Sequence, residues 1–160
     1  MIEGQKESLS QIAQLKYGMI GGGTGSFIGD VHRKAIAMDG KARLVAGCFS
    51  RNYEDTLKTG ETLRLDKSRL YRNYDELLQA ADRHPDRPDF IVIVTPNDSH
   101  YPIARLALEL GFPVVCDKPL ATSSSLAQEL ADLARQKDLL FCVTYTYSGF
   151  PIIKHLRWLI

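Results

Sequence analysis

The sequence has few cysteines, no marked imbalance of charge and no long apolar run. Its 160 residues include three cysteines, Cys48, Cys116 and Cys142, and none has the CxxC or Cys/His spacing of a metal site. Because each lies in an apolar run, we interpret all three as small buried hydrophobic residues in a reducing compartment. The sequence therefore predicts no metal site.

The charge balance and the missing apolar runs exclude further classes of protein. Lys and Arg total 20 against 19 Asp and Glu, which gives a formal net charge of +1 and no basic footprint for nucleic acid. The N-terminal segment MIEGQKESLSQIAQ has no apolar h-region, and no later run reaches the length of a membrane span. We expect a cytoplasmic globular protein without a nucleic-acid or membrane partner, consistent with 44% hydrophobic and 24% charged residues.

Apolar segments alternate regularly with segments of helical period along the chain. This alternation is typical of a parallel sheet with helices on both faces, and we predict an α/β, doubly wound Rossmann fold with six strands. The expected strands are residues 15–20, 44–49, a short segment at 70–72, 90–94, 114–116 and 139–144. Polar residues at 97–99 and 122–125 precede helical periods and are interpreted as helix caps.

The first predicted strand runs into a glycine-rich turn, and an apolar helical period follows. A dinucleotide pyrophosphate binds at such a turn, because free backbone N–H groups and the helix dipole favour an anion. Gly21 and Gly23 match the first two glycines of the dinucleotide fingerprint. The third position is Ser26 by strict spacing, or Gly29 by alignment on the following helix.

In the second alignment, a longer loop lies over the phosphates and offers them hydroxyl and N–H groups. This loop contains Thr24, Gly25, Ser26 and Phe27. His32 shares the apolar face of the following helix, and we interpret it as a packed, hydrogen-bonded side chain rather than a catalytic one.

A carboxylate is missing where NAD-binding sites usually have one. Such sites place Asp or Glu at the end of the second strand, about 20 residues after the fingerprint, to hold the ribose hydroxyls. The sequence there is Phe49-Ser50-Arg51-Asn52. Ser50 and Arg51 would receive a 2′-phosphate, which favours NADP, while stacking of Arg51 on the adenine or its exposure to solvent is the alternative. The missing carboxylate also argues against a methyltransferase.

Two further motifs follow predicted strands, at the edge where open α/β sheets bind ligands. Thr95-Pro96-Asn97 follows the strand at 90–94, and a turn with a helix cap is its structural alternative. Lys118, between Asp117 and Pro119, is placed to hydrogen-bond a substrate hydroxyl and to stabilise developing oxyanion charge. Its alternative is a surface lysine at a strand end. A short-chain dehydrogenase is excluded, because no tyrosine has a lysine four positions on.

Together these motifs resemble the N-terminal half of the Gfo/Idh/MocA family, the glucose–fructose oxidoreductase and inositol dehydrogenase type. The segments that carry the resemblance are GGGTGSFIGDVHR, TPNDSHYPIA, GFPVVCDKPLA and YTYSGFPIIKHLR, in the family's order from about Lys16 onward. The resemblance implies a two-domain NAD(P)-dependent oxidoreductase that acts on sugars, cyclitols and related polyols.

The same resemblance implies roles for individual residues. The family's nucleotide loop falls on residues 21–29, and the residues that flank its nicotinamide fall on Thr95, Pro96, Asn97 and His100. Its Glu-Lys-Pro motif falls on Asp117, Lys118 and Pro119, with aspartate in place of the usual glutamate. Lys118 would bind the reacting hydroxyl, and the Lys118–Pro119 bond can be cis at small cost because it precedes proline.

The expected organisation is an N-terminal extension at 1–14, an NAD(P)-binding domain at 15–147, and at 148–160 the start of an amphipathic helix towards a second α/β domain. By the resemblance, that second domain supplies the general acid/base and the contacts of a homo-oligomer. We expect the given chain to bind a nicotinamide dinucleotide, with a small polyol or sugar as the substrate of the whole protein, and to be inactive alone. A non-catalytic dinucleotide sensor or scaffold is the alternative, against which Lys118 argues.

Overall fold

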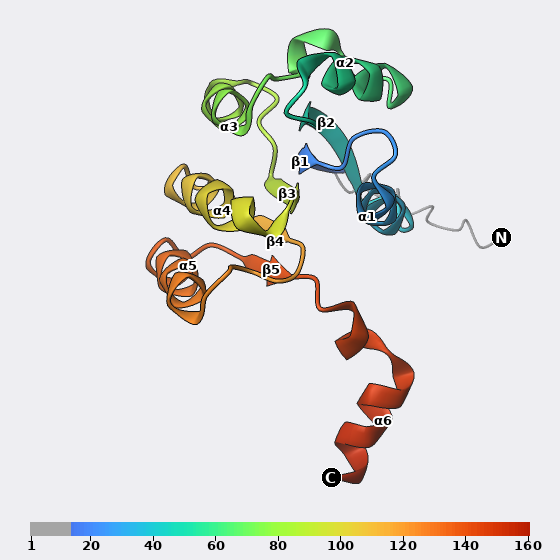
Figure 1. The fold of residues 1–160 in the computed structure, drawn as a ribbon, viewed down its shortest axis with the longest axis vertical. Coiled ribbons are helices and arrows are strands. Elements are labelled where there is room, and N and C mark those ends of the chain that lie inside the picture. The colour runs from blue at the N-terminus through green and yellow to red at the C-terminus, as the bar shows by residue number, and fades with distance from the viewer. Residues whose placement is uncertain (1–13) are drawn as a thin grey trace, which may run out of the picture.

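Five parallel strands pair in the order β2-β1-β3-β4-β5 in the computed structural model, which describes residues 14–160 (Figure 1). The strands are β1 Leu15–Gly21, β2 Ala42–Cys48, β3 Phe90–Val94, β4 Val114–Cys116 and β5 Phe141–Val143. Five of the predicted strands are therefore confirmed, although the last is shorter than expected. The predicted extension at 1–14 lies outside the described residues apart from Gln14.

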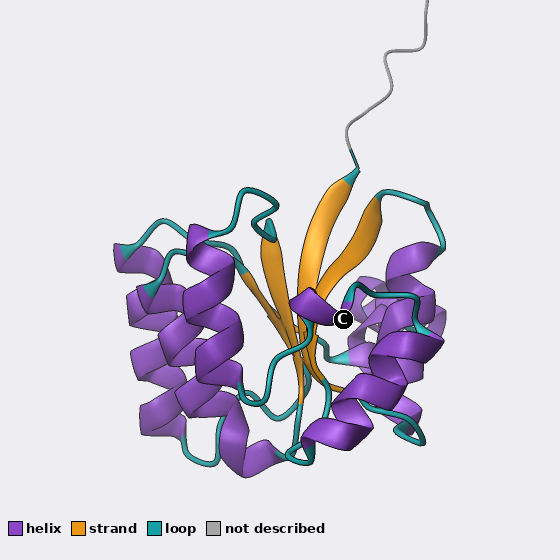
Figure 2. Ribbon diagram, turned by 90° about the horizontal axis from the view of Figure 1, so that it is seen from above, coloured by secondary structure: helices purple, strands orange, loops and turns teal. Residues whose placement is uncertain are grey.

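Helices connect the strands and cover both faces of the sheet (Figure 2). They are α1 Phe27–Ala37, α2 Tyr53–Thr62, α3 Tyr74–Arg83, α4 His100–Glu109, α5 Ser124–Gln136 and α6 Pro151–Leu159, with 3-10 turns at Lys67–Arg69, Asn97–Ser99 and Thr146–Gly149. The predicted cap of α5 is confirmed, because Ser123 Oγ accepts a hydrogen bond from the N–H of Leu126. The predicted cap at 97–99 is wrong, because the Ser99 hydroxyl instead contacts Thr95 Oγ1 and the Pro96 carbonyl.

The predicted strand at 70–72 is wrong. Leu70 forms an isolated parallel bridge with Gly47, and the N–H of Tyr71 donates to the Gly47 carbonyl at 2.9 Å. The chain reaches this point from the turn at Lys67–Arg69 and soon enters α3, which Asn73 caps, so the pairing cannot extend. The bridge lies beyond β2, where the third strand of a Rossmann sheet is normally found.

Alternate side chains of the central strands pack into two separate layers, one on each face of the sheet. Ile20, Ile91 and Ile93 lie in a cluster with apolar residues of α3, α4 and α5. Met19, Val92 and Val94 lie in a second cluster, against residues of α1 and α2. Successive residues of a strand point to opposite faces, so a sheet that is buried on both faces requires a continuous apolar run. The doubly wound fold is thereby confirmed.

The prediction that all three cysteines are buried is wrong for Cys142. Cys48 and Cys116 are buried in the core, whereas Cys142 is exposed on the edge strand β5. Its neighbour Phe141 packs against the core cluster on the α5 side, so Cys142 points to the opposite face. Leu140, immediately before β5, is likewise 82% exposed.

The chain ends in α6, which extends away from the sheet (Figure 1). A helix was expected within 148–160 and is confirmed, while its connection to a further domain stays a prediction. Its apolar side chains, among them Ile152, Leu156 and Trp158, are exposed. No helix of the described residues is long and apolar enough to cross a membrane.

Candidate functional site

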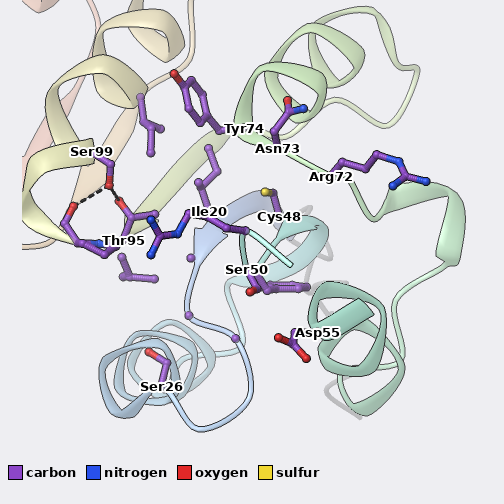
Figure 3. Close-up of a pocket in the computed structure, with 18 of the residues that line it drawn as sticks. Ile20, Ser26, Cys48, Ser50, Asp55, Arg72, Asn73, Tyr74, Thr95 and Ser99 are labelled. Carbon is purple, nitrogen blue, oxygen red and sulfur yellow. Dashed lines mark hydrogen bonds between the residues drawn. The ribbon is translucent and has the colours of Figure 1, made fainter. Parts of the chain in front are cut away.

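A cleft of about 890 Å³ opens at the carboxyl ends of β1 and β3 (Figure 3). β1 leads into α1 on one face of the sheet, and β3 leads towards α4 on the other, so their loops diverge and leave a crevice. The lining segments are Ile20–Thr24 with Ser26, Cys48–Arg51 with Asp55 and Lys58, Arg72–Tyr74, and Val94–Pro96 with Asp98, Ser99 and Ile103. This is the position at which doubly wound sheets bind ligands.

The glycine turn allows α1 to approach the end of β1 very closely. Gly21 and Gly22 have φ angles of +85° and +75°, which side-chain-bearing residues rarely adopt. A Cβ on Gly29 would lie 2.4 Å from the Cα of Gly22. Gly29 therefore occupies the third fingerprint position, while Ser26 caps α1 by accepting a hydrogen bond from the Gly29 N–H at 3.2 Å.

Two loop residues predicted to contact phosphates do not line the cleft. Gly25, at φ +85°, has open space around it, and Phe27 is 83% exposed at the start of α1. Gly21, Gly23, Thr24 and Ser26 do line the cleft. The structure thus brings together most of the predicted loop, and the role of its two outer members stays a prediction.

Ser50 and Arg51 line the cleft at the end of β2, as their position after the strand predicts. The Ser50 Oγ accepts a hydrogen bond from the N–H of Asn52, whose own side chain caps α2. A carboxylate that the sequence reasoning missed also lines the cleft: Asp55, in the first turn of α2 (Figure 3). Asp55 lies on a helix rather than directly after β2, so the spacing that predicts a ribose carboxylate does not indicate it.

Two further cations also line the cleft and were missed by the sequence reasoning. Lys58 lies one turn after Asp55 on α2, with its Nζ 3.9 Å from Asp55 Oδ1. Arg72 lines the cleft too, and its guanidinium lies 4.4 Å from the centre of the Tyr53 ring. Arg72 belongs to the segment predicted as a strand, and a strand there did not indicate that the Arg72 side chain lines the cleft.

The loop after β3 forms the opposite wall of the cleft. Thr95 and Pro96 line it, together with Asp98 and Ser99, whereas Asn97 is exposed outside the lining. The Ser99 hydroxyl lies 2.8 Å from Thr95 Oγ1 and 2.6 Å from the Pro96 carbonyl (Figure 3). These contacts fix the turn that bears Thr95.

His100 is fully buried behind this wall and does not line the cleft. Its Nε2 lies 2.8 Å from the carbonyl oxygen of Thr95, and its Nδ1 lies 2.7 Å from the carbonyl oxygen of Pro119. The imidazole therefore joins the loop after β3 to the loop after β4.

The Asp117-Lys118-Pro119 motif lies on this second loop, outside the lining of the cleft. Asp117 Oδ1 accepts a hydrogen bond from the Thr144 hydroxyl at 2.8 Å and lies 3.6 Å from Nε2 of His32. His32 is buried, so its interpretation as a packed side chain is confirmed. Lys118 and Pro119 are exposed, and the bond between them is cis.

The two buried cysteines, Cys48 and Cys116, have raised thiol pKa values. Burial raises the pKa of Cys48, which lines the cleft, to about 11, and the nearby Glu76 carboxylate adds to the shift. Burial also raises the pKa of Cys116 to about 12, with a further contribution from Asp117. Neither residue is a thiolate at neutral pH, so the cleft has no cysteine nucleophile.

A family model described as "Oxidoreductase family, NAD-binding Rossmann fold" matches residues 15–145. The chain belongs to the Gfo/Idh/MocA oxidoreductase family. An uncharacterised oxidoreductase of Bacillus subtilis, YfiI, is 36% identical over 147 residues, which cover 91% of this chain and 37% of that protein. The D-glucoside 3-dehydrogenase of Escherichia coli is 29% identical over 116 residues, which cover 71% of this chain and 30% of that enzyme.

A solved structure gives the same result. An inositol dehydrogenase homologue from Azotobacter vinelandii, in complex with NADH and myo-inositol, is 37% identical to this chain with a TM-score of 0.88. The match covers 92% of this chain and 39% of the homologue. The chain thus spans about two fifths of the length of that protein and corresponds to the NAD-binding domain of the family.

Proposed function

We propose that this chain is the cofactor-binding part of an NAD(P)-dependent oxidoreductase that transfers hydride between a nicotinamide and a secondary alcohol of a sugar, cyclitol or polyol. The observation that carries the proposal is the cleft at the ends of β1 and β3. The glycine turn at residues 21–24 lines this cleft, and Gly29 lets α1 pack closely against the turn. Family membership and the sugar and inositol dehydrogenases among the relatives support it.

In this proposal the pyrophosphate lies against the turn from Gly21 to Thr24, at the N-terminus of α1, where backbone N–H groups and the helix dipole attract an anion. Thr95 and Pro96 would flank the nicotinamide, and the buried His100 would hold that wall from behind through the Thr95 carbonyl, whereas Asn97 lies outside the lining. When bound, a nicotinamide held there would supply the hydride chemistry. Lys118 would donate a hydrogen bond to the reacting hydroxyl and stabilise its alkoxide as the general base expected from the second domain takes the proton, and Asp117 fixes the loop that bears Lys118.

The proposed cofactor is NADP(H), with NAD(H) as the alternative. Arg51, Lys58 and Arg72 line the side of the cleft next to β2 and α2, where the adenine ribose of a Rossmann ligand lies. Their positive charge favours a 2′-phosphate. The carboxylate of Asp55 in the same wall would instead favour the two ribose hydroxyls of NAD. Because the same wall has both cations and a carboxylate, the relative affinity for NADPH and NADH decides between the two cofactors.

Calorimetric titration of the purified chain with NADH and NADPH tests both parts of the proposal. We expect saturable binding of NADPH that exceeds binding of NADH, and loss of that preference in Arg51→Ala. Arg135→Ala on α5, an exposed arginine outside the cleft, is the matched control. A preference for NADH that survives in Arg51→Ala would reject the NADP assignment, and binding of neither nucleotide would reject the proposed function. Trp158 is 79% exposed on α6, so its fluorescence is a poor reporter of the cleft.

A dinucleotide sensor or scaffold with the same fold is the second candidate. The observation that favours it is the exposure of Lys118 outside the lining of the cleft. A sensor would keep nucleotide binding and have no use for the lysine, whereas an oxidoreductase would lose alcohol oxidation in Lys118→Met. Assay of the protein as it occurs in the cell with myo-inositol and NAD(P)+ separates the two.

A further inference from the structure

Two threonines of α2 are buried although their side chains are polar. Thr56 is 0% exposed and Thr59 is 2% exposed, and the two lie three residues apart on the same face of the helix. Neither lines the cleft, so neither can contact a ligand there directly. A buried hydroxyl is costly unless it is hydrogen-bonded, and the partners of these two hydroxyls indicate what they do.

The Thr59 hydroxyl anchors the glycine turn. Its Oγ1 donates to the Asp55 carbonyl at 2.8 Å and accepts the backbone N–H of Thr24 at 3.0 Å. The Thr24 hydroxyl also lies 3.0 Å from Thr59 Oγ1. Thr24 is the donor of this pair, because Thr59 donates its single hydroxyl hydrogen to the Asp55 carbonyl. One buried side chain of α2 thus holds both the main chain and the side chain of Thr24.

The Thr56 hydroxyl anchors the loop that follows β2 in the same manner. Its Oγ1 accepts the N–H of Phe49 at 3.2 Å and the N–H of Ser50 at 3.0 Å. It also lies 3.3 Å from the Ser50 carbonyl, to which it donates. This loop leads directly to Arg51, the residue expected to meet the ribose.

Each threonine therefore makes its full number of one donated and two accepted hydrogen bonds. Thr59 holds the glycine turn, and Thr56 holds the loop after β2. If the two residues served only to pack α2 on the sheet, alanine or valine would fill the space without burying a hydroxyl. A threonine hydroxyl that bonds to the carbonyl four residues earlier, as in Thr59, also weakens its helix slightly, because it competes with the backbone hydrogen bond. The arrangement is explained by the loops that it fixes.

We propose that Thr59 and Thr56 are positioning residues for the dinucleotide, Thr59 for the pyrophosphate turn and Thr56 for the ribose loop. The proposal rests on the proposed function, because it assumes that the cleft binds NAD(H) or NADP(H). It goes further in assigning two separate parts of the ligand to two buried side chains that do not touch it. Binding energy depends on such preorganisation, since a loop that is ordered only on binding lowers the affinity.

The first test replaces Thr59 with valine, which keeps the shape of threonine and removes the hydroxyl. A methyl group cannot remain 3.0 Å from the Thr24 nitrogen, so the turn must shift. We expect the Kd for NADH and for NADPH to rise by the same factor, about tenfold, the usual effect of losing a buried hydrogen bond. Thr59→Ser, which keeps the hydroxyl and loses the methyl group, should restore the affinity.

Thr62→Val is the matched control. Thr62 lies on the same helix and donates to the carbonyl four residues earlier, as Thr59 does, but it is exposed and contacts neither loop. We expect this variant to bind both nucleotides with unchanged Kd. Thermal unfolding of every variant shows whether it is folded, and hydrogen exchange at the Thr24 amide should be faster in Thr59→Val than in the control.

The second test replaces Thr56 with valine. Because Thr56 holds the loop that bears Ser50, we expect the ratio of the two Kd values, NADH to NADPH, to change by about tenfold, whereas Thr59→Val should leave that ratio unaltered. A purely structural role would weaken both nucleotides alike in both variants. Thr56→Ser should keep the ratio of the unsubstituted chain.

The results separate the inference from the function on which it rests. Failure of the unsubstituted chain to bind either nucleotide would refute the proposed function. If that chain binds, an unchanged Kd in Thr59→Val, an equal loss in Thr59→Ser, or an identical ratio in Thr56→Val and Thr59→Val would refute the positioning roles alone. Accelerated exchange of the Thr24 amide together with a raised Kd in Thr59→Val would uphold the role of Thr59, and a changed ratio of Kd values in Thr56→Val alone would uphold that of Thr56.

Discussion

His32 and Asp117 face each other between α1 and the loop after β4, with Nε2 of the histidine 3.6 Å from Oδ1 of the aspartate. The Thr144 hydroxyl donates to the same carboxylate oxygen at 2.8 Å, so three segments distant in sequence meet at one side chain. Asp117 immediately precedes Lys118. The carboxylate therefore fixes the exposed loop from its buried side, although it is one methylene shorter than the family's usual glutamate.

Removal of this carboxylate should destabilise the chain more than removal of its hydroxyl partner. We expect Asp117→Ala to lower the free energy of unfolding by roughly 2 kcal/mol, since it removes the contact with His32 and leaves the Thr144 hydroxyl only the longer contact with the Cys116 carbonyl. Thr144→Val should cost about half as much, because the contact with His32 remains. Urea unfolding of the two variants measures the difference, and equal losses would show that the contact with His32 contributes nothing.

His100 should be among the most sensitive polar positions of the fold. His100→Ala removes two buried contacts, to the carbonyl oxygens of Thr95 and Pro119, and opens a cavity. We expect the free energy of unfolding to fall by roughly 3 kcal/mol. His155→Ala is the control, because His155 is exposed on α6 and should be neutral. A loss below 1 kcal/mol in His100→Ala would mean that the two loops are held by other contacts.

Gly29→Ala should damage the fold through backbone contact alone. The added Cβ would lie 2.4 Å from the Cα of Gly22, so α1 must move away from the turn. We expect a loss of roughly 2 kcal/mol in the free energy of unfolding together with weaker nucleotide binding. Gly149→Ala, where nothing lies within 4 Å, should be neutral. A stable Gly29→Ala variant with unchanged binding would show that α1 can retreat without cost.

Most of the sheet could be predicted because buried parallel strands leave a strong signal. Residues 90–94 and 114–116 are continuous apolar runs, and the structure has strands at those bounds. The segment at 70–72, Leu-Tyr-Arg, is less apolar, and its neighbours prevent a strand because a 3-10 turn precedes it and a helix capped by Asn73 follows it. Short strands depend on the room that flanking elements leave, and a local pattern contains no such information.

The glycine turn could be placed from the sequence, but its third glycine could not. Strict spacing selects Ser26 and alignment on the following helix selects Gly29, and the choice depends on the tertiary contact of α1 with Gly22. The missed residues have the same cause. Asp55 and Thr59 lie on α2, and their importance depends on which face of that helix turns towards the glycine turn. Side chains that act across two elements leave no spacing signal in the sequence.

The three cysteines should differ sharply in reactivity. Exposed Cys142 should react with a thiol reagent such as Ellman's reagent within seconds to minutes at pH 8, whereas Cys48 and Cys116 should react only on unfolding. Cys142→Ser should abolish the fast phase. Retention of a fast phase in that variant would mean that one of the core thiols becomes accessible through opening of the fold.

The raised thiol pKa values also set the direction of a pH effect. Burial lifts the pKa of Cys48 from 9.0 to about 11, and that of Cys116 from 9.0 to about 12, so the folded state favours the neutral thiols. Below pH 9 both states of the chain are protonated, and the full contribution to stability is present. As the pH rises, the unfolded chain ionises first and gains stability relative to the folded one. The free energy of unfolding should therefore fall between about pH 9 and 12, and Cys116→Ala should make that fall shallower, an outcome that urea unfolding at each pH would measure.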